Sequence, residues 1–313
     1  MKPVRPERLA QLQGVEWLFG FMERYPKMFH IHAGSENEFF KGMVDIHVHA
    51  NPDSLGPRSQ DLVDIAIDYA RVGSRAILHK DHHYSTVGVA YVAQRFIDHL
   101  VESGQLQNRI EVYGGVPLAY TVDPRFVETA AHSEQMRMIF MNCIYGEILV
   151  RDGKVLPKAE DIIRLAADRK LPITICPPNH SIKYTESDYI VVEPLVECIA
   201  KYGGKVLLDH PVTAYTLEEN LHLAQCGAYL GIFCYPTIPD VIKAPVVDPE
   251  LTKTLIDAVG PERCVLGSDK GHLLEPDALA AMRLLLRLLL TWNYTPEQIY
   301  TMASGNAETL LFA

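Results

Sequence analysis

The amino-acid sequence predicts a (β/α)8 TIM barrel, in which eight parallel strands alternate with helices. Short runs rich in Val, Ile and Leu alternate with longer segments of helical periodicity, a pattern typical of a parallel sheet. Eight such runs occur, and 313 residues are enough to close them into one barrel with a large core. A doubly wound open sheet is the alternative, and the absence of a Gly-rich phosphate loop after the first run disfavours it.

Eight segments are predicted as strands because each is a short apolar run followed by room for a helix. In chain order they are residues 43–50, 75–80, 110–116, 137–143, 172–177, 205–211, 228–234 and 264–269. Helical patterns lie between most of them. Residues 59–73 begin at a capping Ser59 and end at Gly73, and residues 158–170 precede the fifth strand.

Two further segments are predicted to be helical. Residues 278–292 form the longest apolar run, and Arg283 and Arg287 interrupt it at helical spacing, which indicates a helix with one solvated stripe. Residues 1–41 lie outside the alternation and are expected to form an N-terminal helical extension that covers the bottom of the barrel or another subunit. Because no low-complexity linker separates this extension from the barrel of residues 42–313, we expect a single domain.

The composition is that of an ordinary globular chain, with 48% hydrophobic and 22% charged residues. A formal net charge of −10 and a pI near 5.7 argue against nucleic-acid and membrane partners. We expect a small-molecule substrate and a homo-oligomer. The N-terminus lacks the pattern of a secretion signal and no apolar span could cross a bilayer, which predicts a cytoplasmic protein. The six cysteines form no CxxC motif and are expected to be reduced thiols.

The first predicted strand ends in two histidines, His47 and His49, within the stretch DIHVHA. Strand side chains alternate between faces, so these two point the same way while Val48 points to the opposite face. Two imidazoles side by side at a strand end can chelate a metal. The pattern alone is equally compatible with two polar residues at a strand end, so the other strand ends decide its meaning.

Several later strands also finish on a side chain suited to bind a metal or move a proton. These side chains are Lys80, His82 and His83 after the second strand, His180 after the fifth, His210 after the sixth and Asp269 after the eighth. The carboxyl ends of barrel strands converge on one face, where active sites lie. Five other histidines, among them His222, lie away from strand ends and are expected to be structural or solvent-facing.

Taken in order, these residues resemble the metal-dependent amidohydrolase superfamily. The resemblance is carried by DIHVHA, His180, DHP with His210, and GPERCVLGSD with Asp269, and SGNAETLL is similar to the helix that closes many members. It spans residues 43–312. The stretch RAILHKDHHYSTVG most resembles a small group of the superfamily whose second strand ends in Lys, a polar residue and His.

The resemblance implies one or two divalent transition-metal ions per chain, with Zn²⁺ expected first and Mn²⁺ or Fe²⁺ as alternatives. His47 and His49 would be ligands from the first strand, and His180 would be a third ligand. His210 would bind a second metal in a binuclear site, or polarise water or substrate in a mononuclear one. Asp269 would bind metal and accept the proton of the attacking water. Neutral imidazole and carboxylate are ligand types that suit these metals.

The sequence departs from the superfamily pattern at the fourth strand, where many binuclear members carry a carboxylated lysine that bridges the metals. RMIFMNCIYG has no lysine, and only Glu147 follows it. Lys80 is therefore the candidate bridging ligand. It is equally well read as a lysine that binds a substrate carboxylate or pairs with Asp81, so the number of metal ions stays open.

The expected function is that of a metal-dependent hydrolase, in which a metal-activated water attacks an amide, cyclic amide or ester bond of a small, carboxylate-bearing molecule. A metal-dependent non-oxidative decarboxylase of the same superfamily is one alternative, and a non-catalytic metal-binding scaffold is another. Loops after the strands carry the candidate substrate contacts, which are Arg58, His82, His83, Tyr84 and Lys270. Arg58 and Lys270 would hold an anionic group unless they are surface charges.

Overall fold

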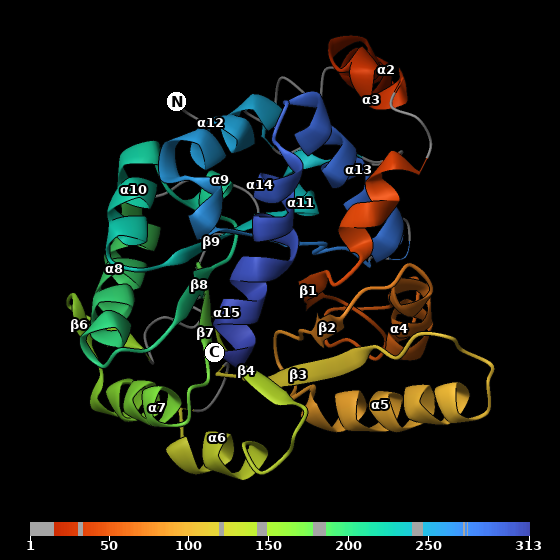
Figure 1. Cartoon of the computed structure of the whole chain (residues 1–313). Helices are drawn as coiled ribbons and strands as arrows, with labels where there is room; N and C mark the ends of the chain where they lie inside the picture. Colours follow the sequence, from red (N-terminus) through yellow and green to blue (C-terminus); the bar gives the residue numbers. More distant parts are fainter. Residues whose placement is uncertain are drawn as a thin grey trace.

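The computed structural model describes residues 16–30, 34–118, 122–142, 149–177, 186–239, 247–271, 273 and 275–313. Within these residues eight parallel strands form one sheet, which helices surround (Figure 1). The strands, paired with their neighbours in this order, are β1 (Val44–Val48), β2 (Ala76–His79), β3 (Glu111–Pro117), β4 (Met136–Asn142), β7 (Ile173–Cys176), β8 (Val206–Leu208), β9 (Tyr229–Phe233) and β10 (Cys264–Gly267). All eight predicted strands are confirmed. A short antiparallel hairpin of β5 (Val150–Arg151) and β6 (Lys154–Val155) was not predicted.

The ends of β1 and β10 are joined directly, which closes the sheet. The amide of Asp269 donates to the carbonyl of His47 at 2.8 Å, and the Ser268 hydroxyl donates to the same carbonyl at 3.1 Å. The amide of Ser268 donates to the buried carboxylate of Asp45 at 3.0 Å. Together with the strand order, these bonds confirm the TIM barrel and place the ends of its first and last strands side by side.

Helices follow the strands as the alternation predicts. They are α4 (Leu62–Arg71), α5 (Val87–Glu102), α6 (Pro124–Ala130), α7 (Pro157–Asp168), α8 (Glu186–Lys201), α9 (Pro211–Ala214), α10 (Leu217–Gln225), α11 (Cys234–Thr237), α12 (Pro249–Val259), α13 (Ala278–Thr291), α14 (Pro296–Tyr300) and α15 (Asn306–Phe312), with short helices η1 (Ser35–Phe40), η3 (Pro261–Arg263) and η4 (Thr301–Gly305). The predicted cap of α4 at Ser59 is wrong. Asp61 caps this helix, because its carboxylate accepts a hydrogen bond from the amide of Asp64.

The barrel has an inner and an outer apolar layer. The inner layer contains Val44, Ile46, Leu78, Phe140, Phe233 and Val265 from the strands, together with Leu310 and Leu311 of α15. Residues that precede the strands hold α15 in place: Arg75 pairs with Glu308, and the ammonium of Lys205 donates to the carbonyl of Thr309. Helix α15 therefore covers the amino ends of the strands, and leaves their carboxyl ends for the site.

The N-terminal extension contains α2 (Glu16–Arg24) and α3 (Pro26–His30), which lie at one edge of the barrel near α13 (Figure 1). The stripe of α13 expected to be solvated is instead largely paired. Arg283 and Arg287 both donate to the carboxylate of Glu36, a buried residue of η1. These arginines therefore attach the segment before β1 to the barrel wall.

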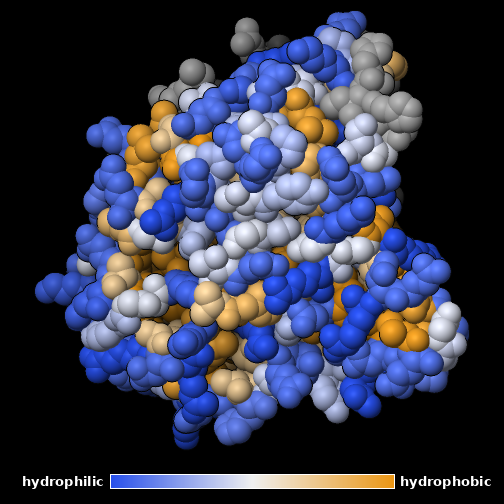
Figure 2. All heavy atoms as spheres, viewed as in Figure 1, coloured by the Kyte–Doolittle hydropathy of each residue, from blue (hydrophilic) through white to orange (hydrophobic). Residues whose placement is uncertain are grey.

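Polar and charged side chains cover most of the face shown in Figure 2, and apolar side chains gather there in separate patches. Among the helices of the described residues, none is long and apolar enough to cross a membrane. Five of the six cysteines lie in the described part of the chain, and all five are free thiols, as expected.

Candidate metal centre

A β-bulge in β1 aims the two histidines into the barrel. Asp45 pairs with Ile77 of β2, and Val48 pairs with His79. Between these two pairs β1 advances by three residues and β2 by only two, so β1 contains one extra residue. Without the bulge, Ile46 and Val48 would lie on the same face of the sheet. The extra residue separates them, because Ile46 lies in the inner apolar layer and Val48 lies in the outer one. His47 and His49 therefore point inward, and Asp45 points outward to the hydroxyl of Tyr69, which donates to it at 2.6 Å.

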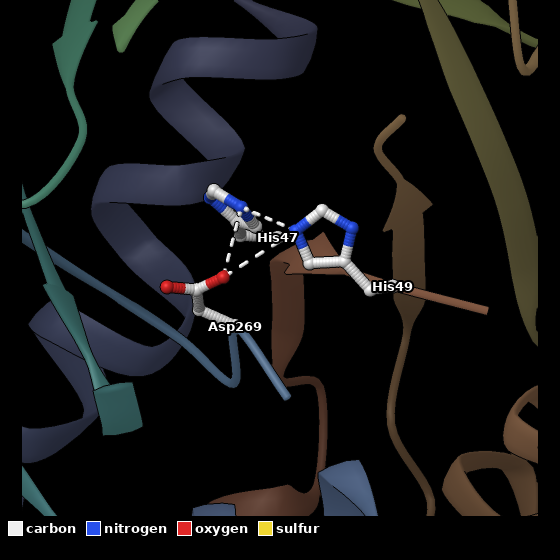
Figure 3. A group of neighbouring side chains, drawn as sticks. All are labelled: His47, His49 and Asp269. Atoms are coloured by element: carbon white, nitrogen blue, oxygen red, sulfur yellow. Dashed lines mark hydrogen bonds and ion pairs between the residues drawn. The ribbon is translucent and has the colours of Figure 1, made fainter. Parts of the chain in front are cut away.

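His47, His49 and Asp269 bring three donor atoms together at the carboxyl end of the barrel (Figure 3). The Nε2 atoms of the two histidines are 3.3 Å apart. Oδ1 of Asp269 lies 3.3 Å from Nε2 of His47 and 3.4 Å from Nε2 of His49. All three side chains are largely buried.

This triangle has the size of one face of a tetrahedral zinc site. Nitrogen and oxygen ligands held about 2.0–2.1 Å from a tetrahedral ion lie about 3.3–3.4 Å from one another. The three observed distances of 3.3, 3.3 and 3.4 Å agree with this value. A buried set of two imidazoles and one carboxylate also suits zinc, manganese or iron. The residues present therefore fit a divalent transition-metal ion.

A buried carboxylate orients His47 from behind. Nδ1 of His47 lies 3.5 Å from Oδ1 of Asp209, which also accepts a hydrogen bond from the Thr174 hydroxyl at 2.8 Å. The other oxygen of Asp209 pairs with the ammonium of Lys80. A hydrogen on Nδ1 leaves Nε2 with its lone pair directed at the triangle, the arrangement that favours metal binding.

His49 has an equivalent arrangement, built from the loop that follows its own strand. Its Nδ1 lies 3.3 Å from Oδ2 of Asp53, in the loop after β1. The same oxygen pairs with the guanidinium of Arg58 at 2.8 Å. Behind each candidate ligand histidine there is thus one carboxylate, and that carboxylate pairs with one cation. All of these side chains are buried, and the two cations neutralise the negative charge of the two carboxylates.

The environment sets the protonation of these groups. Burial, together with the charge of Lys80, lowers the pKa of His47, so its ring is neutral at pH 7. Burial opposes the charged form of His49 as well, but the carboxylates of Asp269 and Asp53 outweigh it and raise its pKa. Burial alone would raise the pKa of Asp269, yet the positive charges that His47, His210 and His49 take up as the pH falls, with a hydrogen bond from His49, hold it well below its usual range. Asp269 is therefore an anion at any working pH.

His210 and Asp269 both have left-handed backbone conformations, with φ of 52° and 44°. Such values are uncommon for residues other than glycine and concentrate at functional sites. The turn at His210 lets Asp209 and His210 face the site in succession. Nδ1 of His210 lies 3.5 Å from Oδ2 of Asp269, the carboxylate oxygen that does not belong to the triangle.

The side chains predicted as substrate contacts do not all lie at the site. His82 lies against the site, because its ring stacks on His49 with parallel planes and centroids 5.2 Å apart. Tyr84 is 63% exposed, and Arg58 is buried against Asp53. The backbone amide of His83 donates a hydrogen bond to the carboxylate of Asp81. This carboxylate also accepts a hydrogen bond from the Ser54 hydroxyl, and so joins the loop after β1 to the loop after β2. His180 lies outside the described residues.

Lys270 belongs to the wall of the site on the His210 side. It is buried, and its ammonium lies 3.7 Å from Glu275 and 5.8 Å from the centre of the Tyr235 ring. That ring in turn packs edge-on against His210, with centroids 5.9 Å apart. Tyr235 is therefore in contact with both His210 and Lys270.

Lys80 lies at an inward position of the barrel, as predicted, and its contact there is Asp209. Burial disfavours the charged amine, but the negative charge of Asp209 outweighs this effect and raises the pKa of Lys80. A charged amine cannot form a carbamate, so the geometry favours a cation that pairs with Asp209 over a bridging ligand. At the end of β4 the corresponding inward residue is Asn142, whose amide donates to the carbonyl of His82 at 2.8 Å, and Glu147 lies outside the described residues.

Three further residues that shape the site are not among those predicted from the sequence. Asp209 stands directly before His210 in DHP, and Asp53 stands four residues after His49, so both lie close to histidines that drew attention alone. Phe233 gave no signal: its ring packs edge-on against His47 with centroids 4.5 Å apart. A Cβ atom at Gly267 would come within 2.9 Å of that ring and 3.2 Å of the Cβ of His47, so this glycine makes room for both.

Comparisons with known proteins agree with this architecture. Residues 42–231 match the model of a family described as "Family of unknown function (DUF6282)", and the match covers more than half of the chain. The chain belongs to this family. The DUF6282 match includes β1 through β8 and most of β9, and therefore the histidine pair with both of its orienting carboxylates. No curated protein sequence matches the chain.

Solved structures share the fold of this DUF6282 protein. It superposes on the probable dipeptidase PvdM from Pseudomonas aeruginosa with a TM-score of 0.58 and 10% identity, over 91% of this chain and 97% of that one. For dihydroorotase from Campylobacter jejuni the TM-score is 0.57 with 13% identity, over 86% and 83% of the two chains. For a probable 2-pyrone-4,6-dicarboxylic acid hydrolase from Acinetobacter baumannii it is 0.55 with 10% identity, over 86% and 98%. At these identities the likeness shows the fold, and it confirms the expected (β/α)8 barrel.

Proposed function

We propose that this DUF6282 protein is a metal-dependent hydrolase that cleaves an amide, cyclic amide or ester bond in a small, carboxylate-bearing molecule. The observation that carries the proposal is the triangle of His47, His49 and Asp269, with each histidine backed by a buried carboxylate. A scaffold that bound metal only for stability would not need His210 beside the free oxygen of Asp269.

The residues that would hold the ion are His47, His49 and Asp269, with His180 and His210 as further candidates. When bound, a divalent ion supplies Lewis-acid activation of water and of a substrate carbonyl. Asp209 and Asp53 keep the Nδ1 hydrogens in place and so direct the Nε2 lone pairs of the two histidines. Lys80 and Arg58 keep those two carboxylates ionised inside the barrel.

Asp269 and His210 are proposed to move the proton. Oδ2 of Asp269 would take the proton of the attacking water, and Nδ1 of His210, 3.5 Å away, would receive it and return it to the leaving group. His210 is held for this role by its turn at the end of β8 and by the rings of Phe233 and Tyr235 on two sides.

The substrate class is proposed from the walls of the site. His82 offers a flat ring beside His49, and Lys270 offers a buried cation beyond Tyr235, which suits a small ring or acyl group that carries a carboxylate. The superposed structures are those of a probable dipeptidase, a dihydroorotase and a probable 2-pyrone-4,6-dicarboxylic acid hydrolase. Substrates of these three kinds are therefore the first to test.

The test is a screen of dipeptides, cyclic amides and lactones with zinc- or manganese-loaded protein in water enriched in oxygen-18. Hydrolysis incorporates one solvent oxygen into the product, and Asp269→Asn should abolish it while the variant keeps its fold. Release of carbon dioxide without incorporation of solvent oxygen would instead identify a decarboxylase. Absence of turnover by a fully loaded protein across all three classes would leave only the metal-binding scaffold.

A further inference from the structure

A second group of metal-ligand side chains lies on the outside of the barrel, between α8 and α10, which run side by side in Figure 1. Glu193 and Glu197 are one helical turn apart on α8, and His222 and Cys226 are one turn apart at the end of α10. Residues one turn apart share a helix face, so each helix presents two donors to the other. The sequence analysis expected His222 to be structural or solvent-facing.

Two distances in this group, both from His222, match those of a tetrahedral site. Nε2 of His222 lies 3.3 Å from Oε1 of Glu193 and 3.7 Å from Sγ of Cys226. Around a tetrahedral zinc ion, a nitrogen and an oxygen ligand lie about 3.3 Å apart, and a nitrogen and a sulfur ligand about 3.6 Å apart. The donor atoms of Glu193, Glu197 and His222 all lie within 4.8 Å of one another. The sulfur of Cys226 lies outside this set of three and is next to its histidine, so it would have to turn toward the carboxylates to complete the site.

The charges in the group also favour a cation. In the part of the chain that the structure describes, neither Glu193 nor Glu197 forms an ion pair with a lysine or arginine, and the partners of Glu193 are His222 and the Tyr189 hydroxyl, which donates to the same oxygen at 2.5 Å. Like charges one turn apart on a helix repel each other. Burial raises the pKa of the Cys226 thiol, and the charges of Glu197 and Glu193 raise it further, so the sulfur lies in the same negative field.

We propose that Glu193, Glu197, His222 and Cys226 form a second zinc site, the outer zinc site, that links α8 to α10. Its mixture of thiolate, imidazole and carboxylate donors is one that zinc accepts, and the thiolate disfavours magnesium and calcium. The side chains of His222 and Glu193 are 44% and 34% exposed, so an ion can reach the site from solvent without passing through the barrel.

The outer zinc site would act on stability, because it joins the helix that follows β7 to the helix that follows β8. These are the two strands whose ends lead to His180 and to His210. Linking the two helices would restrain that part of the barrel wall from outside. The site is independent of the proposed hydrolase chemistry, since it shares no residue with the triangle in the barrel.

Cobalt titration tests the outer zinc site, because cobalt bound to a thiolate gives a near-ultraviolet charge-transfer band that imidazole and carboxylate ligands do not give. The full-length His47→Ala, His49→Ala variant, in which the barrel triangle is removed, is titrated with cobalt and then with zinc. We expect the band to appear at one equivalent, to be displaced by zinc, and to disappear when Cys226→Ser is added. Cys198→Ser, which removes another thiol of α8, is the matched control and should keep the band.

A second measurement covers the case in which Cys226→Ser misfolds. His222→Gln in the same background should lose at least tenfold in zinc affinity, and zinc should no longer raise its unfolding temperature. Absence of the band in folded protein, or a band that survives Cys226→Ser, would overturn the proposal. An unfolding temperature that zinc leaves unchanged in the His47→Ala, His49→Ala variant would also overturn it, and the pair of His222 and Glu193 would then be an ordinary surface ion pair.

Discussion

The pair of Lys80 and Asp209 offers the sharpest test of how the barrel site is built. Both side chains are buried, at 1% and 0% exposure, so Lys80→Met leaves a carboxylate inside the barrel without its cation. Removing one partner of a buried ion pair costs about 3–5 kcal/mol. We expect about 3 kcal/mol, the lower end, because Thr174 still donates to Asp209 and Nδ1 of His47 still faces it.

The assay is urea unfolding of chelator-treated protein at pH 7, so that metal binding does not contribute to the measured free energy. Lys80→Met combined with Asp209→Asn removes the unpaired charge and should recover stability to within about 1 kcal/mol of the parent. The matched control is Lys253→Met. Lys253 pairs with Asp257 on the surface of α12, and its loss should cost no more than about 0.5 kcal/mol.

Metal binding separates the roles of the two residues. In the double variant His47 loses the carboxylate behind Nδ1, so the affinity of the barrel site for zinc should fall about 10- to 100-fold although stability has recovered. The pH dependence has a defined sign. Lys80 holds the pKa of Asp209 below its usual range despite burial, so the stability this pair provides is present above about pH 3.9 and is lost as the pH falls below it.

One combined result would refute this reasoning. If Lys80→Met is as stable as the parent, loses one metal ion per chain and regains activity when short carboxylic acids are added, then Lys80 is a carboxylated bridging ligand.

Four further outcomes follow from the site. His47→Ala with His49→Ala should remove metal from the barrel, and equal barrel metal content by elemental analysis would contradict the triangle. Asp269→Asn should keep the circular-dichroism spectrum but lose turnover at least about 100-fold, since an amide cannot take the proton. Asp53→Asn should weaken zinc binding about 10- to 100-fold in chelator competition, and unchanged affinity would show that Asp53 does not orient His49. Asp81→Asn should cost about 1–3 kcal/mol at pH 7, because Asp81 accepts bonds from two loops. Those bonds outweigh burial and lower the pKa of Asp81, so this difference should shrink below about pH 3.9, and a constant difference would contradict the assignment.

The sequence by itself determined the fold and the chemical types in the site. Short continuous apolar runs alternating with helical patterns predict eight parallel strands, because a strand in a barrel covered by helices is buried on both faces. The ends of those strands carry His47, His210 and Asp269, and a closed barrel brings all strand ends together whatever the details of packing. The resemblance in motif order added the expectation of a divalent metal.

Only the tertiary structure decided which way the histidines point and what stands behind them. Strict alternation puts His47 on the face of Asp45, and the bulge in β1 is what turns it inward beside Ile46. A bulge depends on pairing with β2, so the sequence of β1 alone cannot show it.

The partners of Lys80 and Arg58 were decided in the same way. As isolated residues they read as a metal ligand and a substrate contact, but folding places each beside a carboxylate that is distant in sequence or hidden in a loop. Lys80 meets Asp209 across 129 positions of the chain. A buried charge takes its role from the partner that compensates it, and only the folded barrel brings those partners together.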